Sequence, residues 1–259
     1  MISKARYTAA LKAAVTHLLA SSLVAALAAV LVFGFWYPYP YRELSGGREL
    51  FLLIMAVDVV CGPLLTAVLF SPSKPRGELW RDLTIVALLQ LGALAYGLHT
   101  VSTARPLFLV SETDRFKVIA AADLQDDAAT QELMALPEEL KPRFFQGPVM
   151  IAIREPKDAQ ERKTVLFESV QGGRDYAERP DFYQSYSGDA ALKSLVRAKP
   201  LSVFLEKQPN QKAAAAELAA KKGVEIQQWM YLPVVARQDW VAVLDKRGQI
   251  QGFLKGDGF

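Results

Sequence analysis

The sequence has few of the residues on which most enzymes and metal proteins depend. Its 259 residues include one cysteine, Cys61, and two histidines, His17 and His99. A single cysteine excludes an intramolecular disulfide framework and a cysteine-rich metal site. Residues 105–259 contain neither histidine nor cysteine, which excludes Ser-His-Asp catalysis, Cys-His catalysis and a conventional zinc site there. Catalysis by a carboxylate pair stays open, because the 22 acids of this part form many pairs.

Nucleotide-binding and calcium-binding motifs are missing as well. No stretch matches a GxGxxG motif, a P-loop or an EF-hand loop. The pairs of glycines at 172–173 and at 256 and 258 are explained more simply as turns. We therefore predict a protein that needs no cofactor or metal.

Charge is scarce in the first part of the chain and dense in the second. Residues 1–104 hold 8 Lys/Arg and 5 Asp/Glu, whereas residues 105–259 hold 22 of each. The net charge of +3 therefore belongs to the apolar part, and it does not form the clustered basic face typical of a nucleic-acid-binding protein. We predict a membrane domain over 1–104, a soluble domain over 105–259, and no nucleic-acid partner.

Three apolar runs are long enough to cross a bilayer, which takes about 20 helical residues. They cover residues 18–36, 50–70 and 83–101. A cleaved signal peptide ending near Ala28 is an alternative for the first run, but the run continues eight residues beyond Ala28, so we expect a retained anchor. The predicted fold is three transmembrane helices followed by an α+β domain with a mixed sheet.

Cations indicate the orientation of these spans. The N-terminal tail and the second loop carry three each, the first loop carries two, and one follows the third span. In that order they are Lys4, Arg6 and Lys12; Lys74, Arg76 and Arg81; Arg42 and Arg48; and Arg105. Because short cytoplasmic loops carry an excess of Lys and Arg, the pattern predicts a cytoplasmic N-terminus and places residues 105–259 on the outer side.

Aromatic residues gather at the outer end of the first span. They are Phe35, Trp36, Tyr37, Tyr39 and Tyr41. Amphipathic rings prefer the headgroup region of a bilayer. We therefore expect an interfacial aromatic belt here, in contact with the lipid bilayer.

The second span contains an acidic residue, which is rare inside a bilayer. Asp58 is its ninth residue, and an acid inside a membrane costs at least about 2.5 kcal/mol. Gly62 and Pro63 follow, and Pro63 removes the donor for the carbonyl of Val59, so we expect a kink. Two interpretations are open for this polar site. A protonated Asp58 can hydrogen-bond Gln90 of the third span or a water, or Asp58 can dock another transmembrane helix; we favour the first.

From Arg105 the pattern changes to short β-rich runs and amphipathic helices. Helices are predicted at 123–136, at 189–198, and from Asn210, as the N-cap, to Lys222, with Gly223 beyond the end. Strands are predicted at 107–110, 116–120, 149–153, 164–170, 201–205, 228–236, 240–244 and 250–254.

Residues 33–70, reading FGFWYPYPYRELSGGRELFLLIMAVDVVCGPLLTAVLF, resemble the type IV pilin accessory proteins of Gram-negative bacteria, the TfpX/TfpZ family. The similarity is carried by the segments 35–38, 45–47, 58–60 and 62–66, and it extends to Asp114-Arg115-Phe116. The resemblance implies an inner-membrane protein with a periplasmic domain. It also implies a pilin as the partner, support for the stability and assembly of that pilin, and contact with the pilus assembly machinery. No catalytic residues are assigned to the family, so the resemblance implies that the protein is not an enzyme.

Two other functions remain as alternatives. A membrane-anchored periplasmic ligand-binding or sensory protein would bind a periplasmic molecule with residues 105–259. It is disfavoured by a cytoplasmic face of only a tail of about 16 residues and a loop of about 12. A membrane enzyme using Asp58 is disfavoured because no second acid or histidine lies at a similar depth.

Overall fold

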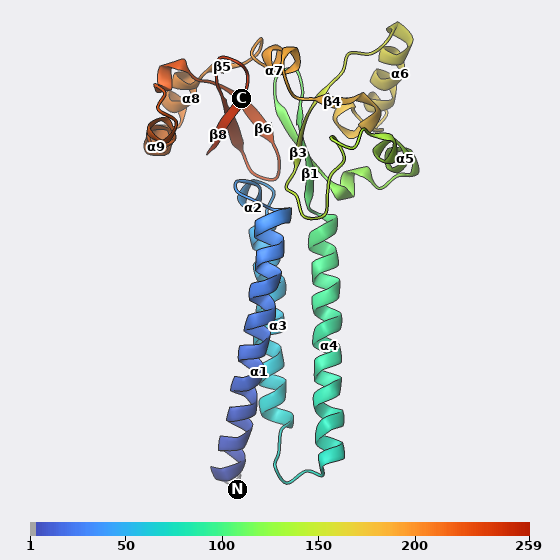
Figure 1. Ribbon diagram of the computed structural model, residues 1–259, viewed down its shortest axis with the longest axis vertical. Coiled ribbons are helices and arrows are strands. Elements are labelled where there is room, and N and C mark those ends of the chain that lie inside the picture. Colours follow the sequence, from blue (N-terminus) through green and yellow to red (C-terminus); the bar gives the residue numbers. More distant parts are fainter. Residues whose placement is uncertain (1–3) are drawn as a thin grey trace.

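Three long helices stand side by side beneath a domain built on one sheet (Figure 1). This arrangement comes from a computed structural model that describes residues 4–259, with side chains from Arg6 onward. The side chain of Lys4, which contributes to the predicted charge of the tail, lies outside the described residues.

The helical part begins with α1 (Lys4–Leu31), which continues into the π-helical turn η1 (Val32–Trp36). The short helix α2 (Tyr41–Leu44) follows, and then come α3 (Gly47–Leu69) and α4 (Arg76–Thr103). The three long helices have the length and apolar composition needed to cross a membrane. α3 runs through Pro63 as one continuous helix.

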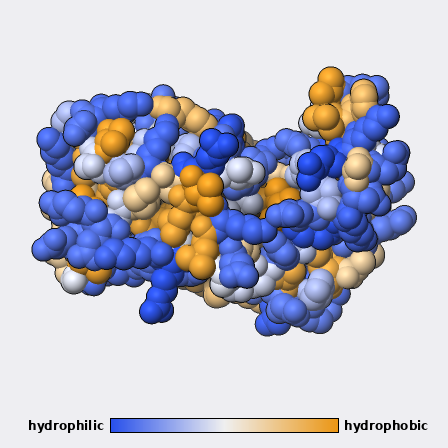
Figure 2. Space-filling model, turned by 90° about the horizontal axis from the view of Figure 1, so that it is seen from above, coloured by the Kyte–Doolittle hydropathy of each residue, from blue (hydrophilic) through white to orange (hydrophobic). Residues whose placement is uncertain are grey.

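The helices expose apolar side chains, unlike the far surface of the domain. Leu19, Leu53 and Val68 are 67%, 67% and 72% exposed. The surface of the domain that faces away from the helices is mostly hydrophilic, with apolar side chains in separate patches (Figure 2). Burying leucine and valine in a hydrocarbon phase removes this apolar area from water, so the helical part suits a bilayer and the domain suits water.

α3 is the central helix, because α1 and α4 each pack along it and barely contact one another. Glycine permits close approach on the α4 side. A Cβ atom at Gly97 would lie 2.3 Å from Cγ2 of Ile54, a distance that no side chain tolerates. Small residues at helix contacts in membranes have this role, because packing rather than hydrophobicity holds such helices together.

The sheet of the domain is mixed, as predicted. Its strand order is β4-β3-β1-β2-β6-β7-β8, with β5 paired to β6; β1 pairs with β3 and β2 with β6 in parallel, and the other pairs are antiparallel. The strands are β1 (Pro106–Ser111), β2 (Phe116–Ala120), β3 (Val149–Ile153), β4 (Tyr183–Ser185), β5 (Lys199–Pro200), β6 (Met230–Val235), β7 (Trp240–Leu244) and β8 (Ile250–Lys255). Every residue of β1 and β7 is buried, so both faces of these strands are covered.

Helices cover the sheet in two lobes, with α5 and α6 on one side of Figure 1 and α8 and α9 on the other. The helices are α5 (Asp127–Ala135), α6 (Ala159–Val170), α7 (Asp189–Ser194), α8 (Leu201–Lys207) and α9 (Lys212–Lys222). Short 3-10 turns lie at η2 (Ala121–Leu124), η3 (Tyr176–Glu178), η4 (Pro180–Phe182), η5 (Pro209–Gln211) and η6 (Ile226–Gln228).

Two predicted strands are helices. Residues 164–170 belong to α6, whose N-cap Asp158 accepts a hydrogen bond from the main-chain N–H of Glu161 at 2.7 Å. Residues 201–205 form most of α8, in which Leu201, Phe204 and Leu205 are buried. Their spacing of three and four residues is that of one helix face, and it outweighs the β propensity of the run.

The N-cap of α9 also differs from the prediction. Asn210 lies in the 3-10 turn η5, and Gln211 occupies the cap position without a side-chain hydrogen bond. The C-terminal end is as predicted, because Gly223 adopts the left-handed conformation with φ 64°.

The helical part and the domain share one hydrophobic core. Tyr41 and Leu44 of α2 pack with Leu232, Val234 and Trp240 of the sheet. The main-chain N–H of Gln238 also donates to the carbonyl of Leu44 at 3.0 Å. The loop between α1 and α3 is therefore part of the domain's interior.

Candidate functional site: a polar groove between the helices

α1 and α4 leave a groove between them, with α3 as its floor. The groove has a volume of about 210 Å³. We call it the α1–α4 groove, and it is lined by His17, Ala20, Ser21, Val24 and Ala25 of α1, Met55 and Asp58 of α3, and Ala87, Gln90, Leu91 and Leu94 of α4. Its lining combines small apolar residues with four polar ones, which is unusual for the interior of an apolar helix group.

Asp58 lies on the floor of the α1–α4 groove and is half-buried. It is 11 residues after Gly47, the first residue of α3, which places it roughly 16 Å from that end at about 1.5 Å per residue. Its carboxyl group makes no hydrogen bond or ion pair with any residue of the described chain. An acid at mid-helix without a partner is the main chemical anomaly of the helical part.

Gln90 is held next to Asp58, as predicted, but by a different contact. Its Nε2 donates a hydrogen bond to the main-chain carbonyl of Asp58 at 2.9 Å. The favoured interpretation gave the Asp58 carboxyl a bond to Gln90 or to a water, whereas the bond from Gln90 goes to the main-chain carbonyl of Asp58. Gln90 reaches the backbone because Gly62 lacks a side chain: a Cβ atom there would lie 2.0 Å from Nε2. Pro63 follows Gly62 and is also buried in the helix contact.

A second polar contact at the groove was missed from the sequence. Nδ1 of His17 and Oγ1 of Thr66 lie 2.5 Å apart and join α1 to α3. No contact of His17 is predicted from the sequence. The available signal was its distance from Trp36, because 19 residues of helix place it about 28 Å from that end, at the same depth as Thr66.

The aromatic residues at the other end of α1 are packed more tightly than a belt facing lipid. Phe35 and Tyr39 are exposed, whereas Trp36, Tyr37 and Tyr41 are buried. The indole Nε1 of Trp36 donates to the carbonyl of Phe144 at 3.1 Å, and their rings meet edge to face. Three of the five predicted belt residues therefore serve the junction between the helices and the domain.

Arg105 completes this junction. Its guanidinium lies 5.7 Å from the ring centroid of Trp36 and 5.6 Å from that of Phe144. Cation–π contacts of this kind contribute about 0.5–2 kcal/mol, depending on how far water is excluded. Phe35 and Phe145 add a further edge-to-face pair. We call Phe35, Trp36, Arg105, Phe144 and Phe145 the junction cluster.

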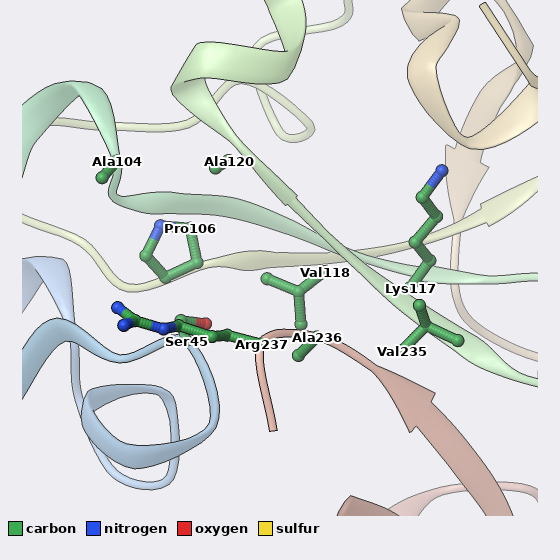
Figure 3. A pocket seen from close by; sticks show the side chains of 9 residues that line it. All are labelled: Ser45, Ala104, Pro106, Lys117, Val118, Ala120, Val235, Ala236 and Arg237. Carbon is green, nitrogen blue, oxygen red and sulfur yellow. The ribbon is translucent and has the colours of Figure 1, made fainter. Parts of the chain in front are cut away.

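A second cavity of about 250 Å³ is lined by Ser45, Ala104, Pro106, Lys117, Val118, Ala120, Val235, Ala236 and Arg237 (Figure 3). Arg237 extends along it toward Ser45, whereas the amine of Lys117 points away and pairs with Glu178 at 2.7 Å. Arg237 lies against Gly46, where a Cβ atom would come within 2.6 Å of its Cδ. The cavity lining contains no acid and no histidine.

Within residues 4–259, no group of three or more His, Cys, Asp or Glu side chains is placed to hold a metal ion. Asp58 has no second acid beside it in the groove lining, so the carboxylate pair used in glycoside hydrolysis is not formed there.

Comparison with known proteins decides the family. Two fimbrial assembly proteins of Dichelobacter nodosus, of serogroups I and E1, are 35% and 34% identical to this chain over 261 residues. Each match covers 100% of this chain and 99% of the relative. The chain belongs to the fimbrial assembly protein family. The resemblance to type IV pilin accessory proteins is thereby confirmed at the level of the family.

Further comparisons agree on the family. The model of fimbrial assembly protein FimB matches residues 5–46, which hold the α1 wall of the groove, η1 and α2. A fimbrial assembly protein of D. nodosus serogroups C1 and C2 is 39% identical over 130 residues, which is 50% of this chain and 99% of that relative. No solved structure matches this chain.

Proposed function

We propose that this protein is an inner-membrane accessory protein that stabilises a type IV pilin before assembly and presents it to the assembly machinery, without catalysis. The observation that carries the proposal is similarity along the whole chain to two proteins named fimbrial assembly proteins.

The proposed topology has three membrane spans, a cytoplasmic N-terminus and residues 105–259 in the periplasm. Three apolar helices of sufficient length support it. The start of α1 and the loop between α3 and α4 lie at the same end of the helices (Figure 1), and that loop region carries Lys74, Arg76 and Arg81. The excess of cations at this end favours its placement in the cytoplasm.

An unassembled pilin of the proposed kind presents two parts to its partner, an apolar helix in the membrane and a globular head in the periplasm. The present chain likewise combines apolar helices with a sheet domain. Because Tyr41 and Leu44 join the helices to the sheet, these two parts of the chain are held in one relative position. A partner that binds only the intact pilin stabilises it by mass action, by about 2.7 kcal/mol at a hundred times the dissociation constant.

A periplasmic ligand-binding or sensory protein was the alternative. The α1–α4 groove and the cavity beside Arg237 hold about 210 and 250 Å³, below the usual range of about 300–1,000 Å³ for small-molecule sites. The names of the relatives concern assembly rather than sensing. The accessory role is therefore the better supported one.

Deletion of the gene in a strain that retains its pilin gene tests the proposal. We expect fewer surface fimbriae and less cellular pilin, measured by electron microscopy and immunoblotting, with recovery on complementation. Secretion of an unrelated periplasmic enzyme serves as the control. Unchanged fimbriation and pilin level in the deletion strain would overturn the accessory function. Alkaline phosphatase fused after Ala120 should be active and fused within residues 71–81 inactive, which tests the topology separately.

A further inference from the structure

The α1–α4 groove has the geometry of an incomplete helix bundle. α3 contacts both neighbours, whereas α1 and α4 form the two walls and barely meet. The walls carry Ala20, Ser21 and Ala25 on one side and Ala87 on the other. Small residues let the backbone of a further helix approach closely, which is how helices associate in membranes.

Hydrogen bonding within the described residues accounts for two of the four polar side chains that line the groove. The amide of Gln90 donates to the carbonyl of Asp58, and the ring of His17 pairs with Thr66. The carboxyl of Asp58 and the hydroxyl of Ser21 have no such partner. Ser21 and Asp58 both line the space between the two walls.

Lipid chains fill such a groove sterically but cannot satisfy these groups. Hydrocarbon offers no hydrogen-bond donor or acceptor, so an acid that faces lipid retains its full desolvation cost. A transmembrane helix removes this cost if it carries a donor at the depth of Asp58. The groove has a floor and two walls, so it accommodates one helix and becomes a four-helix bundle.

We propose that the α1–α4 groove receives the apolar helix of the pilin, with a hydrogen-bond donor of that helix opposite Asp58. This inference rests on the proposed function, which supplies the partner. It adds the surface that the pilin occupies and the group that recognises it. Selectivity then depends on where along its helix the partner carries a donor.

Two neighbouring serines provide a matched test. Ser21 lines the α1–α4 groove, whereas Ser22 is exposed on the next position of α1 and is not part of the lining. In a Cys61→Ser background, Ser21→Cys and Ser22→Cys each introduce one thiol at the same depth. The probe is the pilin with single cysteines placed along its apolar helix, co-expressed with the full-length chain. Oxidised membranes are examined for the disulfide-linked adduct, and copurification of pilin is measured in parallel.

The inference predicts an adduct for Ser21→Cys at one or two adjacent pilin positions and at least about tenfold less adduct for Ser22→Cys. Copurification of pilin without this difference would overturn the groove as the contact surface and leave the proposed function standing. Absence of both adduct and copurification would overturn both. An adduct between two copies of this chain through Ser21→Cys would assign the groove to self-association and overturn the inference as well.

Substitution of Asp58 tests the recognising group. Asp58→Asn retains an acceptor of the same shape, so the Ser21→Cys adduct and the protein level should be preserved. Asp58→Leu fills the same space without an acceptor and should lower the adduct roughly three- to tenfold, the range of one interhelical hydrogen bond in a membrane. Equal adduct yields for Asp58→Leu and Asp58→Asn at equal protein level would show that Asp58 does not recognise the partner.

Discussion

The hydroxyl of Tyr37 donates a hydrogen bond to the main-chain carbonyl of Val101 at 3.1 Å, and both residues are fully buried. Val101 lies in the last turn of α4, where carbonyl groups lack helical donors. The ring of Tyr37 also lies against Gly47 of α3, where a Cβ atom would come within 2.3 Å of it. One side chain that follows α1 therefore joins α3 and α4 at the level of the domain.

Tyr37→Phe should destabilise the protein by about 1–3 kcal/mol, because it keeps the ring and leaves a buried carbonyl unpaired. For a chain of this size that loss lowers the melting temperature by about 2–4 °C per kcal/mol. Thermal unfolding of the full chain in detergent micelles measures it. Tyr39→Phe is the control, since Tyr39 is 59% exposed and should give no change. Equal melting of wild type and Tyr37→Phe would mean that the bond contributes nothing.

Leu44 gives a second prediction about the union of helices and domain. It is fully buried in the cluster that includes Leu232 and Trp240. Leu44→Ala should cost about 2–5 kcal/mol, the usual range for a buried leucine. The readout is unfolding of the domain followed by tryptophan fluorescence. Leu53→Ala, at a position 67% exposed on α3, should leave that transition unchanged.

The same contact predicts how an isolated domain behaves. A fragment of residues 105–259 lacks Tyr41 and Leu44, so it should melt at a lower temperature than the domain within the full chain. Adding a peptide of residues 37–47 should raise that temperature. If the fragment alone, with no peptide added, melts at the same temperature as the domain in the full chain, then Tyr41 and Leu44 contribute no stability to the domain.

The sequence predicted elements where local chemistry decides them. Gly223 ends α9 in the left-handed conformation that glycine favours. The three long helices are predicted from the length of their apolar runs alone. α6 carries two conflicting local signals. Asp158 and Glu161 have the spacing of a capping box before the run, whereas the β-branched residues within the run favour a strand, and the structure follows the capping signal.

The parts that escaped prediction depend on contacts between distant residues. Nothing local indicates that Tyr41 and Leu44 of α2 pack with Leu232 and Trp240, which lie almost two hundred residues later in the chain. At the site, Asp58 and Gln90 stood out as polar residues in apolar runs. Their actual contact uses the Asp58 backbone, which carries no sequence signal, and it depends on Gly62.

Glu161 predicts how the domain responds to acid. Its carboxylate accepts two hydrogen bonds from the Arg154 guanidinium, each 2.9 Å, and one from the main-chain N–H of Lys157. These contacts, the Arg154 bonds first, lower the pKa of Glu161 to about 2. A lowered pKa contributes stability that is present above the unfolded value near 4.5 and is lost as the pH falls toward 2.

Glu161→Gln should therefore lower stability at pH 7 and flatten the fall in melting temperature between about pH 4.5 and pH 2. Melting curves of the full chain across this range measure both effects. Glu139→Gln is the control, because Glu139 is exposed and forms no ion pair with the described residues. If the melting temperature of Glu161→Gln falls with pH as that of wild type does, Glu161 does not contribute to the loss of stability in acid.

Glu112 should act in the opposite direction. Burial raises the pKa of its carboxyl, so ionisation in the folded state costs stability as the pH rises above the ordinary value. Glu112→Gln should therefore raise the melting temperature at pH 7 and leave it nearly unchanged at pH 3. A lower melting temperature at pH 7 would instead show that attraction to Lys117 and Arg115 outweighs the cost of burial.

Gly62 provides the sharpest test of the helix contact that positions Asp58. Gly62→Ala places a methyl group 2.0 Å from Nε2 of Gln90, so either α4 moves away or Gln90 loses its bond to the Asp58 carbonyl. Overpacking of this kind costs about 1–3 kcal/mol. Gly92→Ala is the matched control, since nothing lies within 4 Å of its added Cβ. There alanine should stabilise the helix, by up to about 1 kcal/mol.

The double variant Gly62→Ala/Gln90→Ala separates steric conflict from loss of the hydrogen bond. Shortening Gln90 removes the clash, so the double variant should be more stable than Gly62→Ala alone and close to Gln90→Ala alone. The coupling between the two sites should be about 1–2 kcal/mol, within the range found for residues in contact. Melting temperatures of the four proteins in one detergent give this coupling. Additive effects would mean that Gly62 and Gln90 are not in contact, so that α3 and α4 do not pack together through these two residues.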